Sequence, residues 1–313
     1  MILAEKIIKG NRTALGQGIT LLESTLPKHE KKAQELLANC LPHSGKSIRI
    51  GITGVPGVGK STFIETFGKL LTKKGEKVAV LAIDPTSEKT RGSILGDKSR
   101  MHELSTDKNA FIRPSPSSGS LGGVTNKTRE NIILCEAAGF EIILIETVGV
   151  GQSETSVNNL VDFFLLLMLA GAGDELQGIK RGIMEIADAL VITKADGDNN
   201  QKAKNAALEY KRALHMFPAM ENGWTPKVST CSAIENKGLD EIFETINSFN
   251  NQMLSNGWKT KNRNDQKKYW LHLKIKEELG SKKYKSLIES GKIKLLEKEI
   301  AKGKTLYQVT ENL

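Results

Sequence analysis

The sequence predicts an α/β fold in which a mainly parallel sheet carries helices on both faces. Short apolar runs recur through the middle of the chain, and helical stretches and glycine-containing turns separate them. Strands of a parallel sheet are buried on both faces, so they read as continuous apolar runs. Their alternation with helices is typical of the α/β class. A chain of 313 residues has room for one such domain and for helical additions.

The pattern divides the chain into three zones. Residues 1–46 are expected to form an N-terminal helical segment, because apolar side chains such as Ala14, Ile19 and Leu22 recur at helical spacing. Residues 47–253 carry the strand and helix alternation, and residues 254–313 read as a lysine-rich helical segment. We therefore expect one central α/β domain between two helical additions.

The elements of the central zone follow in order. Isoleucines alternate at positions 48, 50 and 52 in a first strand, which runs into a glycine-rich loop. A helix is expected from Lys60 to about Lys73, and a continuous apolar run predicts a strand over 78–83. Further strands are expected at 141–145, 162–170, 189–193 and 227–231.

The formal net charge of +9 is concentrated at one end of the chain. Residues 251–313 hold 15 Lys and Arg against 7 Asp and Glu. A basic tail can bind acidic partners, nucleic acid among them. Here, however, apolar residues such as Trp270, Leu271 and Ile275 interleave with the lysines at about helical intervals. That pattern favours amphipathic helices with solvated lysine faces over a nucleic-acid partner.

Cysteine and histidine residues do not group into a metal site or a disulfide framework. Cys40, Cys135 and Cys231 are odd in number and far apart, and the five histidines are equally scattered. The chain does not open with a basic segment followed by an apolar core. The most apolar stretch, 161–172, contains Asp162 and is too short to span a bilayer. A cytoplasmic protein without membrane contact is expected.

The glycine-rich loop after the first strand matches a phosphate-binding motif in full. It reads Gly54-Val55-Pro56-Gly57-Val58-Gly59-Lys60-Ser61-Thr62, which fits GxxxxGK[ST] between a strand and a helix. Glycines let backbone N–H groups approach phosphate oxygens, and the helix N-terminus adds positive potential. Lys60 would neutralise phosphate charge, and the Ser61 hydroxyl would ligate Mg²⁺. The motif predicts a P-loop nucleoside triphosphatase.

Three acidic residues are candidates for holding the metal and positioning water. Asp84 and Glu146 end strands, where ligands collect in open α/β sheets, and Asp97 lies in a glycine-containing loop. Glu146 and Gly149 form the acid-x-x-Gly shape of an element that senses a γ-phosphate. We expect Ser61, Asp84, Asp97 and Glu146 around the metal.

The glutamine that positions water in Ras-like proteins is missing from its usual place. Val150 follows Gly149 directly, and Gln152 comes two positions later. Slow intrinsic hydrolysis is therefore predicted, with acceleration by a partner or a second subunit.

A second motif predicts guanine as the base. Thr193, Lys194 and Asp196 close a strand as Thr-Lys-x-Asp. A carboxylate at this position can accept hydrogen bonds from guanine N1 and N2, and adenine offers no matching pair of donors. The Lys194 stem can lie along the base. Downstream, a further strand leads into the segment expected to reach the guanine O6, which consists of Ser232, Ala233 and Ile234.

These motifs and the strings around them resemble the MeaB-like GTPases, also called MMAA- or ArgK-type, which chaperone adenosylcobalamin-dependent methylmalonyl-CoA mutase. The resemblance covers nearly the whole chain. Two of its strings are unusual elsewhere and make it specific, namely 146–154 and 173–183. The others are Gly16–Ser24, Gly54–Thr62, Asp84–Ser87, Gly92–Met101 and Arg113–Gly119.

The resemblance implies more than the residues alone. Members of the family are homodimers with a C-terminal dimerisation arm, here 254–313, and they gate cobalamin delivery to the mutase and protect it. Their magnesium-binding and catalytic acids fall on Asp84, Asp97 and Glu146. Their additional switch segment falls around 174–181, where Lys180 would couple nucleotide state to the partner.

Two positions depart from the family pattern. Thr193 stands where many members have Asn, a residue that also braces the phosphate loop, so weaker guanine affinity is expected. Arg91 stands where members usually have Gly, and a solvated surface arginine is the favoured interpretation.

Other functions stay open at this point. A transport-associated kinase carries the ArgK label, although the sequence offers no evident acceptor pocket. A nucleotide-dependent binding module for another partner is a second alternative. A nickel-insertion GTPase is disfavoured, because such proteins need Cys or His clusters at the loading site.

Overall fold

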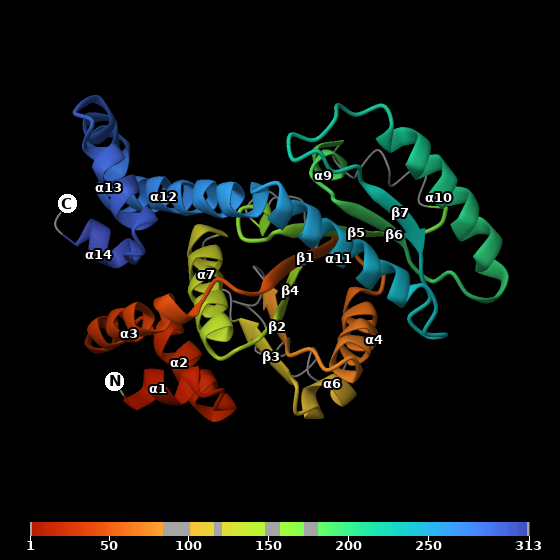
Figure 1. Ribbon diagram of the computed structural model, residues 1–313, viewed down its shortest axis with the longest axis horizontal. Helices are drawn as coiled ribbons and strands as arrows, with labels where there is room; N and C mark the ends of the chain where they lie inside the picture. Colours follow the sequence, from red (N-terminus) through yellow and green to blue (C-terminus); the bar gives the residue numbers. More distant parts are fainter. Residues whose placement is uncertain (1, 84–100, 116–120, 148–156, 172–180, 312) are drawn as a thin grey trace. The chain divides into compact units, whose positions relative to one another are not determined.

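The computed structural model describes residues 2–83, 101–115, 121–147, 157–171, 181–311 and 313 (Figure 1). The chain forms two compact units. One comprises residues 47–128 and 140–258, and the other comprises residues 1–46, 129–139 and 259–313.

The first unit is built on a seven-stranded sheet in the order β3-β2-β4-β1-β5-β6-β7 (Figure 1). Every neighbouring pair is parallel. Strand β1 is central, and it is flanked by β4 and β5, so the loop that leaves β1 emerges in the middle of the carboxyl edge. The strands are β1 (Ile48–Gly54), β2 (Val78–Ile83), β3 (Ala110–Ser115), β4 (Ile142–Thr147), β5 (Phe163–Met168), β6 (Ala189–Ile192) and β7 (Lys227–Thr230).

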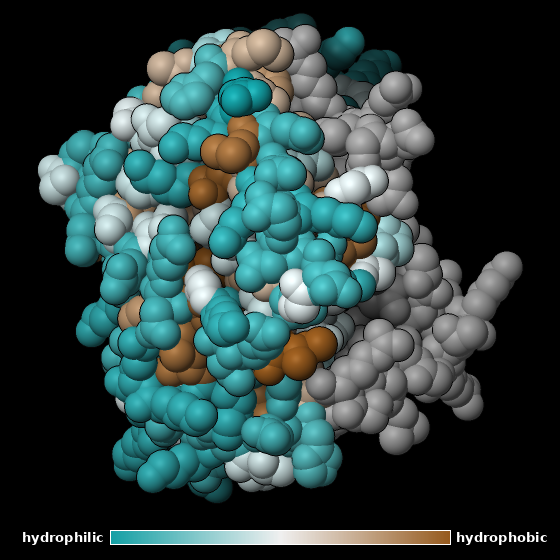
Figure 2. Space-filling model, turned by 90° about the vertical axis from the view of Figure 1, so that its right-hand side faces the viewer, coloured by the Kyte–Doolittle hydropathy of each residue, from teal (hydrophilic) through white to brown (hydrophobic). Residues whose placement is uncertain are grey.

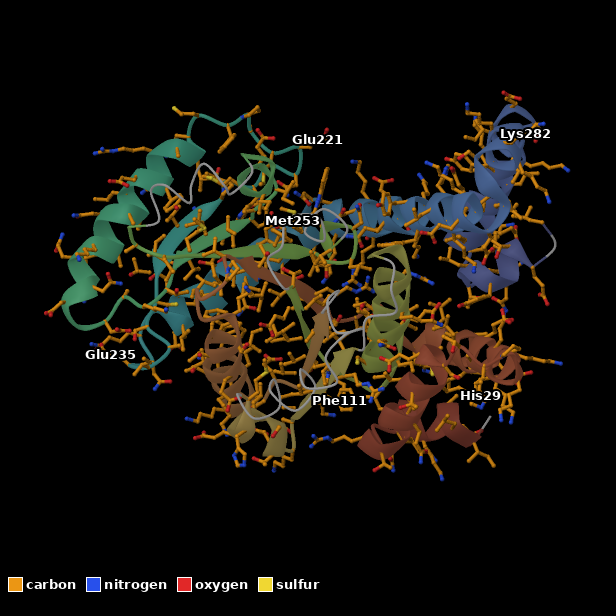
Figure 3. The ribbon with its side chains drawn as sticks, turned by 180° about the vertical axis from the view of Figure 1, so that it is seen from behind. His29, Phe111, Glu221, Glu235, Met253 and Lys282 are labelled. Atoms are coloured by element: carbon orange, nitrogen blue, oxygen red, sulfur yellow. The ribbon has the colours of Figure 1, made fainter. Side chains whose placement is uncertain are left out.

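The predicted fold class is confirmed, and the sheet has one strand more than the sequence analysis expected. Strand β3 was missed because Arg113 and Pro114 interrupt its apolar run. It forms the outer edge of the sheet, where proline is tolerated because one side of the strand needs no ladder hydrogen bonds. Phe111 on this strand is marked in Figure 3.

Three helices bury their apolar sides on one face of the sheet. They are α4 (Lys60–Lys73), α6 (His102–Thr106) and α11 (Leu239–Ser255). Phe63 and Phe67 of α4 stack with ring centroids 5.3 Å apart, and Phe163 of β5 meets Phe249 of α11 edge to face at 5.0 Å. These contacts join the phosphate-loop helix and α11 to the same core. Met253, near the end of α11, belongs to it as well (Figure 3).

The remaining helical segments connect the other strands of this unit. Helix α10 (Asn200–Leu214) packs on β6 and β7 through Ala203, Ala206 and Tyr210. Helix α9 (Arg181–Glu185) precedes β6, and the 3-10 turn η3 (Gly197–Asn199) precedes α10. Helix α7 (Leu121–Ala137) follows β3 and continues into the second unit.

The second unit is helical, as predicted for both ends of the chain. Its helices are α1 (Ile2–Ile8), α2 (Arg12–Glu23), α3 (Pro27–Cys40), η1 (Leu41–His43), α12 (Trp258–Glu289), α13 (Lys292–Ala301) and α14 (Leu306–Thr310), with the end of α7. Gly18 of α2 allows close packing, because a Cβ there would lie 2.8 Å from Ile7 and 3.2 Å from Leu134. Helix α12 bends at Gly280, whose φ of 76° is not helical.

A buried carboxylate joins three segments of this helical unit. Glu136 of α7 accepts a hydrogen bond from the Gly45 backbone N–H at 2.8 Å. Arg263 of α12 lies 3.8 Å from the same carboxylate and donates to the Gly45 carbonyl at 2.6 Å. The hydrogen bond and the nearby arginine offset the cost of burying the Glu136 charge, and removing either partner would leave that charge uncompensated. Residues 1–46 and 259–313 are thereby held to one helix.

Within the described part of the chain, no helix is long and apolar enough to cross a bilayer.

Candidate nucleotide-binding site

The phosphate loop requires glycine at its two ends. Gly54, at the end of β1, has a φ of 155°, and a Cβ there would lie 2.4 Å from the Leu167 carbonyl oxygen. Gly59 has a φ of 92° directly before α4 begins at Lys60. Side chains disfavour these conformations, so the glycines set the path of the backbone. Buried Val58 fixes the loop to the core, whereas Pro56 and Gly57 are exposed.

Lys60 lies over the loop that precedes it. Its Nζ donates to the Gly54 carbonyl at 2.8 Å and to the Val55 carbonyl at 3.4 Å. The ammonium group therefore sits on the concave side of the loop, where phosphate oxygens would replace or join these carbonyl partners. The predicted phosphate-binding residues are thus brought together on one turn and one helix start.

Ser61 and Glu146 meet on the metal side of the site. The Ser61 hydroxyl donates to Glu146 Oε1 at 3.2 Å, and Glu146 is only 9% exposed at the end of β4. The next residue, Thr147, donates from its hydroxyl to the Thr53 hydroxyl at 2.8 Å and so joins β4 to β1 beside the loop. The first turn of α4 and the end of β4 therefore place two oxygen ligands side by side at the phosphate loop.

Several predicted residues lie outside the described part of the chain. They are Asp84, Asp97, Gly149, Lys180 and Arg91. Among the described residues, no three His, Cys, Asp or Glu side chains converge as a metal site would require. Ser61 and Glu146 are the members of the predicted metal set that the structure describes.

Thr193 braces the phosphate loop. Its hydroxyl donates to the Val58 carbonyl at 2.7 Å and lies 3.3 Å from the Met168 carbonyl. The weaker guanine affinity expected from threonine in place of asparagine stays a prediction. The threonine side chain, 5% exposed at the end of β6, nevertheless reaches the loop carbonyl directly.

Lys194 spans the loop from the opposite side. Its backbone is left-handed, with a φ of 55°, and its Nζ donates to the Gly57 carbonyl at 2.9 Å. Asn199 donates to the Lys194 carbonyl at 2.7 Å and so supports this unusual conformation. The sequence analysis did not identify Asn199, since no motif marks it. The Lys194 stem thus crosses to the loop, and its methylene groups are the surface on which the sequence analysis expected the base to lie.

Asp196 and Ser232 come together from the ends of β6 and β7. The Ser232 hydroxyl donates to Asp196 Oδ2 at 2.7 Å and accepts the Glu235 backbone N–H at 3.1 Å. The Asp196 carboxylate is therefore oriented by a serine that is itself fixed by its own loop. Backbone hydrogen bonds from Ala195 N to Cys231 O, at 3.0 Å, hold the two loops in register.

The loop after β7 is closed by its own backbone. Ser232 and Lys237 exchange two backbone hydrogen bonds of 3.0 Å. Gly238 ends the loop with a φ of 76°, and a Cβ there would lie 2.2 Å from the Thr230 carbonyl oxygen. Glu235 marks this loop in Figure 3. Ile234 is 78% exposed and Ala233 is half-buried beside it, so both are accessible to a base held by Asp196.

The arrangement fits a nucleoside triphosphate with a base that offers two adjacent donors. Phosphate ligands gather at the end of β1, oxygen donors at the end of β4, and base-reading groups at the ends of β6 and β7. All of them lie at the carboxyl edge of one parallel sheet, where open α/β sheets bind ligands.

Comparisons with known proteins agree with this arrangement. Residues 15–287 match the family described as "Methylmalonyl Co-A mutase-associated GTPase MeaB". A probable GTPase of Mycobacterium tuberculosis is 53% identical over 268 residues, which cover 86% of this chain and 80% of that protein. The mitochondrial methylmalonic aciduria type A homolog of Mus musculus is 47% identical over 309 residues, covering 95% and 74%.

A solved structure agrees with the fold as well. The crystal structure of an LAO/AO transport system kinase superposes with a TM-score of 0.77 at 41% identity, covering 88% of this chain and 83% of that one. The match of the family to most of the chain, together with these relatives, shows the family. It belongs to the MeaB family of methylmalonyl-CoA mutase-associated GTPases.

Proposed function

We propose that this GTPase is a nucleotide-controlled switch that assists and protects an adenosylcobalamin-dependent acyl-CoA mutase, methylmalonyl-CoA mutase first of all, while the cofactor is loaded. The family description and the name of the murine relative both point to this mutase. The observation that carries the proposal is the pairing of a complete phosphate loop with an oriented Asp196, which supplies the nucleotide end of such a switch.

Guanine selection rests on the Asp196 carboxylate. Ser232 occupies one side of that carboxylate with a charge-assisted hydrogen bond of 2.7 Å. The carboxylate is thereby held in the plane in which it would accept from guanine N1 and N2. Lys194 and Ile234 offer apolar surface to the faces of the base, and Thr193 keeps the loop at the correct distance.

Mg²⁺ fits the oxygen donors beside the phosphate loop. Ser61 and Glu146 present a hydroxyl and a buried carboxylate 3.2 Å apart, which is the hard, oxygen-only chemistry that this ion prefers. Asp84 and Asp97 complete the proposed set. When bound, the ion would neutralise charge that develops on the transferring phosphoryl group. Lys60 would act on the same charge from the loop side.

Hydrolysis is proposed to be slow in the isolated protein and faster with its partner. The residue after Gly149 is valine, so the chain does not present a water-positioning glutamine at the usual place. Lys180 is the proposed coupling residue between nucleotide state and partner. We further propose that the protein forms a homodimer through residues 254–313. We also propose a cytoplasmic location, which agrees with the free, buried thiols of Cys40, Cys135 and Cys231.

A transport-associated kinase is the second candidate, and the crystal structure of the LAO/AO transport system kinase favours it. The two functions differ in where the γ-phosphoryl group goes. With γ-labelled GTP, the switch releases inorganic phosphate only, whereas a kinase transfers label to a protein acceptor.

The partner is tested by retention of purified mutase. Methylmalonyl-CoA mutase is passed over the immobilised full chain loaded with GDP or with a non-hydrolysable GTP analogue. The proposal expects retention that differs between the two nucleotides. The matched control is Asp196→Asn, which should lose the difference with guanine nucleotides and regain it with the xanthine forms. Equal failure to retain the mutase in both nucleotide states would refute the partner assignment.

A further inference from the structure

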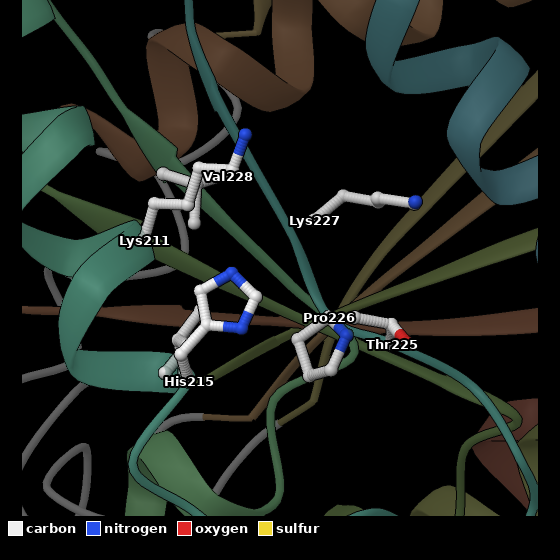
Figure 4. A pocket seen from close by; sticks show the side chains of 7 residues that line it. Lys211, His215, Thr225, Pro226, Lys227 and Val228 are labelled. Atoms are coloured by element: carbon white, nitrogen blue, oxygen red, sulfur yellow. The ribbon is translucent and has the colours of Figure 1, made fainter.

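A surface hollow of about 410 Å³ lies in the sheet-containing unit, between the end of α10 and the start of β7 (Figure 4). Its lining comes from the last turn of the helix and from the segment that enters the edge strand. The lining residues are Lys211, Leu214, His215, Thr225, Pro226, Lys227 and Val228. A volume of this size is within the range of small-molecule sites.

The hollow is remote from the nucleotide along the strands. Strand β7 runs from Lys227 to Thr230, and the guanine-facing Ser232 follows its carboxyl end. Thr225 and Pro226 precede its amino end. Because all strands are parallel, the hollow lies at the amino ends of the strands, whereas the phosphate loop lies at their carboxyl ends. A ligand here would not contact the nucleotide.

A lysine of α10 and the histidine that follows the helix face this hollow. In Figure 4, Lys211 and His215 extend from the end of the helix to one side of β7, whereas Lys227 points away from them. Lys227 instead lies 5.7 Å from the ring centroid of Trp224. Within the described part of the chain, Lys211 and His215 have neither an acidic partner nor a side-chain hydrogen bond.

Capping of the helix does not account for these two side chains. The carbonyls of Lys211, Ala213 and Leu214 already accept backbone N–H groups of residues 215, 216 and 217 at 3.3, 3.0 and 3.2 Å. The Lys211 ammonium and the His215 imidazole are therefore available to a ligand. Thr225 also lines the hollow, but in Figure 4 its hydroxyl lies on the Lys227 side of β7, away from His215.

The floor of the hollow is apolar. Leu214, Pro226 and Val228 supply it, and all three are partly exposed rather than packed in the core. An apolar floor with a few converging polar groups is the usual composition of a site for an organic ligand. The positive charge of Lys211 favours an anionic ligand.

We propose that this hollow binds a small organic anion. Its carboxylate or phosphate would pair with Lys211 and His215, and its apolar part would lie on Leu214, Pro226 and Val228. The face that carries α10 is otherwise mostly hydrophilic, with separate apolar patches (Figure 2). The site is independent of the proposed mutase partnership.

The test follows the five histidine signals by proton–carbon NMR on the full chain saturated with GDP. The His215→Gln variant assigns the signal of His215. Hexanoate and phenyl phosphate are the anionic probes, and hexanol is the neutral match for hexanoate. We expect one or both anions to shift the His215 signal in a saturable way, and hexanol to leave it unshifted. The stronger of the two probes distinguishes a carboxylate ligand from a phosphate ligand.

Charge variants then locate the site. Lys211→Met keeps the apolar stem and removes the charge, and it should weaken probe affinity about tenfold or more, the loss of one charge-assisted contact. Arg212→Glu is the matched control, since this exposed neighbour does not line the hollow and should keep affinity within about twofold at physiological salt. Absence of any saturable shift, equal binding of hexanol, or unchanged affinity in Lys211→Met would overturn the proposal.

Discussion

Thr193→Val isolates the contact that braces the phosphate loop. The substitution keeps the branched shape of a side chain that is 5% exposed and removes the hydroxyl that donates to Val58 O at 2.7 Å. Val58 is fully buried, so water cannot take the place of the hydroxyl. A buried acceptor left without its donor costs about 1–3 kcal/mol.

That cost is divided between folding and nucleotide binding. Destabilisation of the nucleotide-free protein lowers its free energy of unfolding. Displacement of the phosphate loop weakens GDP binding. Because 1.4 kcal/mol is about a factor of ten, the combined loss corresponds to about fivefold to 150-fold. Titration with a fluorescent GDP analogue and urea unfolding of the same samples measure the two parts.

Two controls separate the hydroxyl from the change in shape. Thr193→Ser keeps the donor and should retain most of both quantities, and Thr193→Asn should also brace the loop through its amide N–H. If Thr193→Val binds GDP and unfolds as the unmodified protein does, the hydrogen bond to Val58 contributes neither to stability nor to nucleotide binding.

Three further predictions address the base site and the core. Asp196→Asn should shift preference from GTP to XTP, because the amide N–H matches the xanthine 2-oxo group; competition titrations with both nucleotides check it, and unchanged GTP preference refutes the base assignment. Ser232→Ala removes the 2.7 Å bond that orients Asp196 and should weaken GDP binding about fivefold to tenfold at unchanged XTP discrimination, measured by the same titration. Burial, with a smaller contribution from Asp162, raises the pKa of Asp188 to about 8 from its ordinary 3.8. A raised folded-state pKa gives stability that is present at low pH and lost as pH rises, here between about 4 and 8. In urea unfolding, Asp188→Asn should therefore gain stability relative to the unmodified protein as the pH rises across that window. Parallel pH profiles of the two proteins would contradict this prediction.

The sequence was sufficient for the fold class and for most strands, because parallel strands are marked by apolar runs that need no tertiary information. Helix α4 begins and ends at Lys60 and Lys73, as the glycine loop and the Lys74–Gly75 turn predict. Strand β3 was not predicted because strands were expected as continuous apolar runs. An edge strand need not be one, and β3 therefore tolerates Arg113 and Pro114.

The division of the chain was less accessible to sequence reasoning. Residues 129–139 belong with the two ends of the chain, and the buried Glu136 is the reason that the structure gives. Its partners, Gly45 and Arg263, are 91 residues before it and 127 residues after it, and no local pattern marks such a pairing. Packing of distant segments decides the boundary.

In the nucleotide-binding site, too, motif residues could be predicted, whereas the residues that support them could not. Motifs identified Lys60, Asp196 and Ser232 by spacing alone, whereas Asn199 has no signature and acts on the backbone of Lys194. The sequence also could not show that Thr193 braces the phosphate loop, because a family pattern compares residue types and not distances. In the structure its hydroxyl donates to the Val58 carbonyl at 2.7 Å.

The central claim, that a mutase partner controls this GTPase, is tested most directly by single-turnover hydrolysis of GTP with and without purified methylmalonyl-CoA mutase. The account predicts slow hydrolysis by the isolated chain and an increase of about tenfold or more when the mutase is present in excess, a change of about 1.4 kcal/mol in the barrier. Fast hydrolysis by the isolated chain, or a rate that the mutase leaves unchanged, would contradict it.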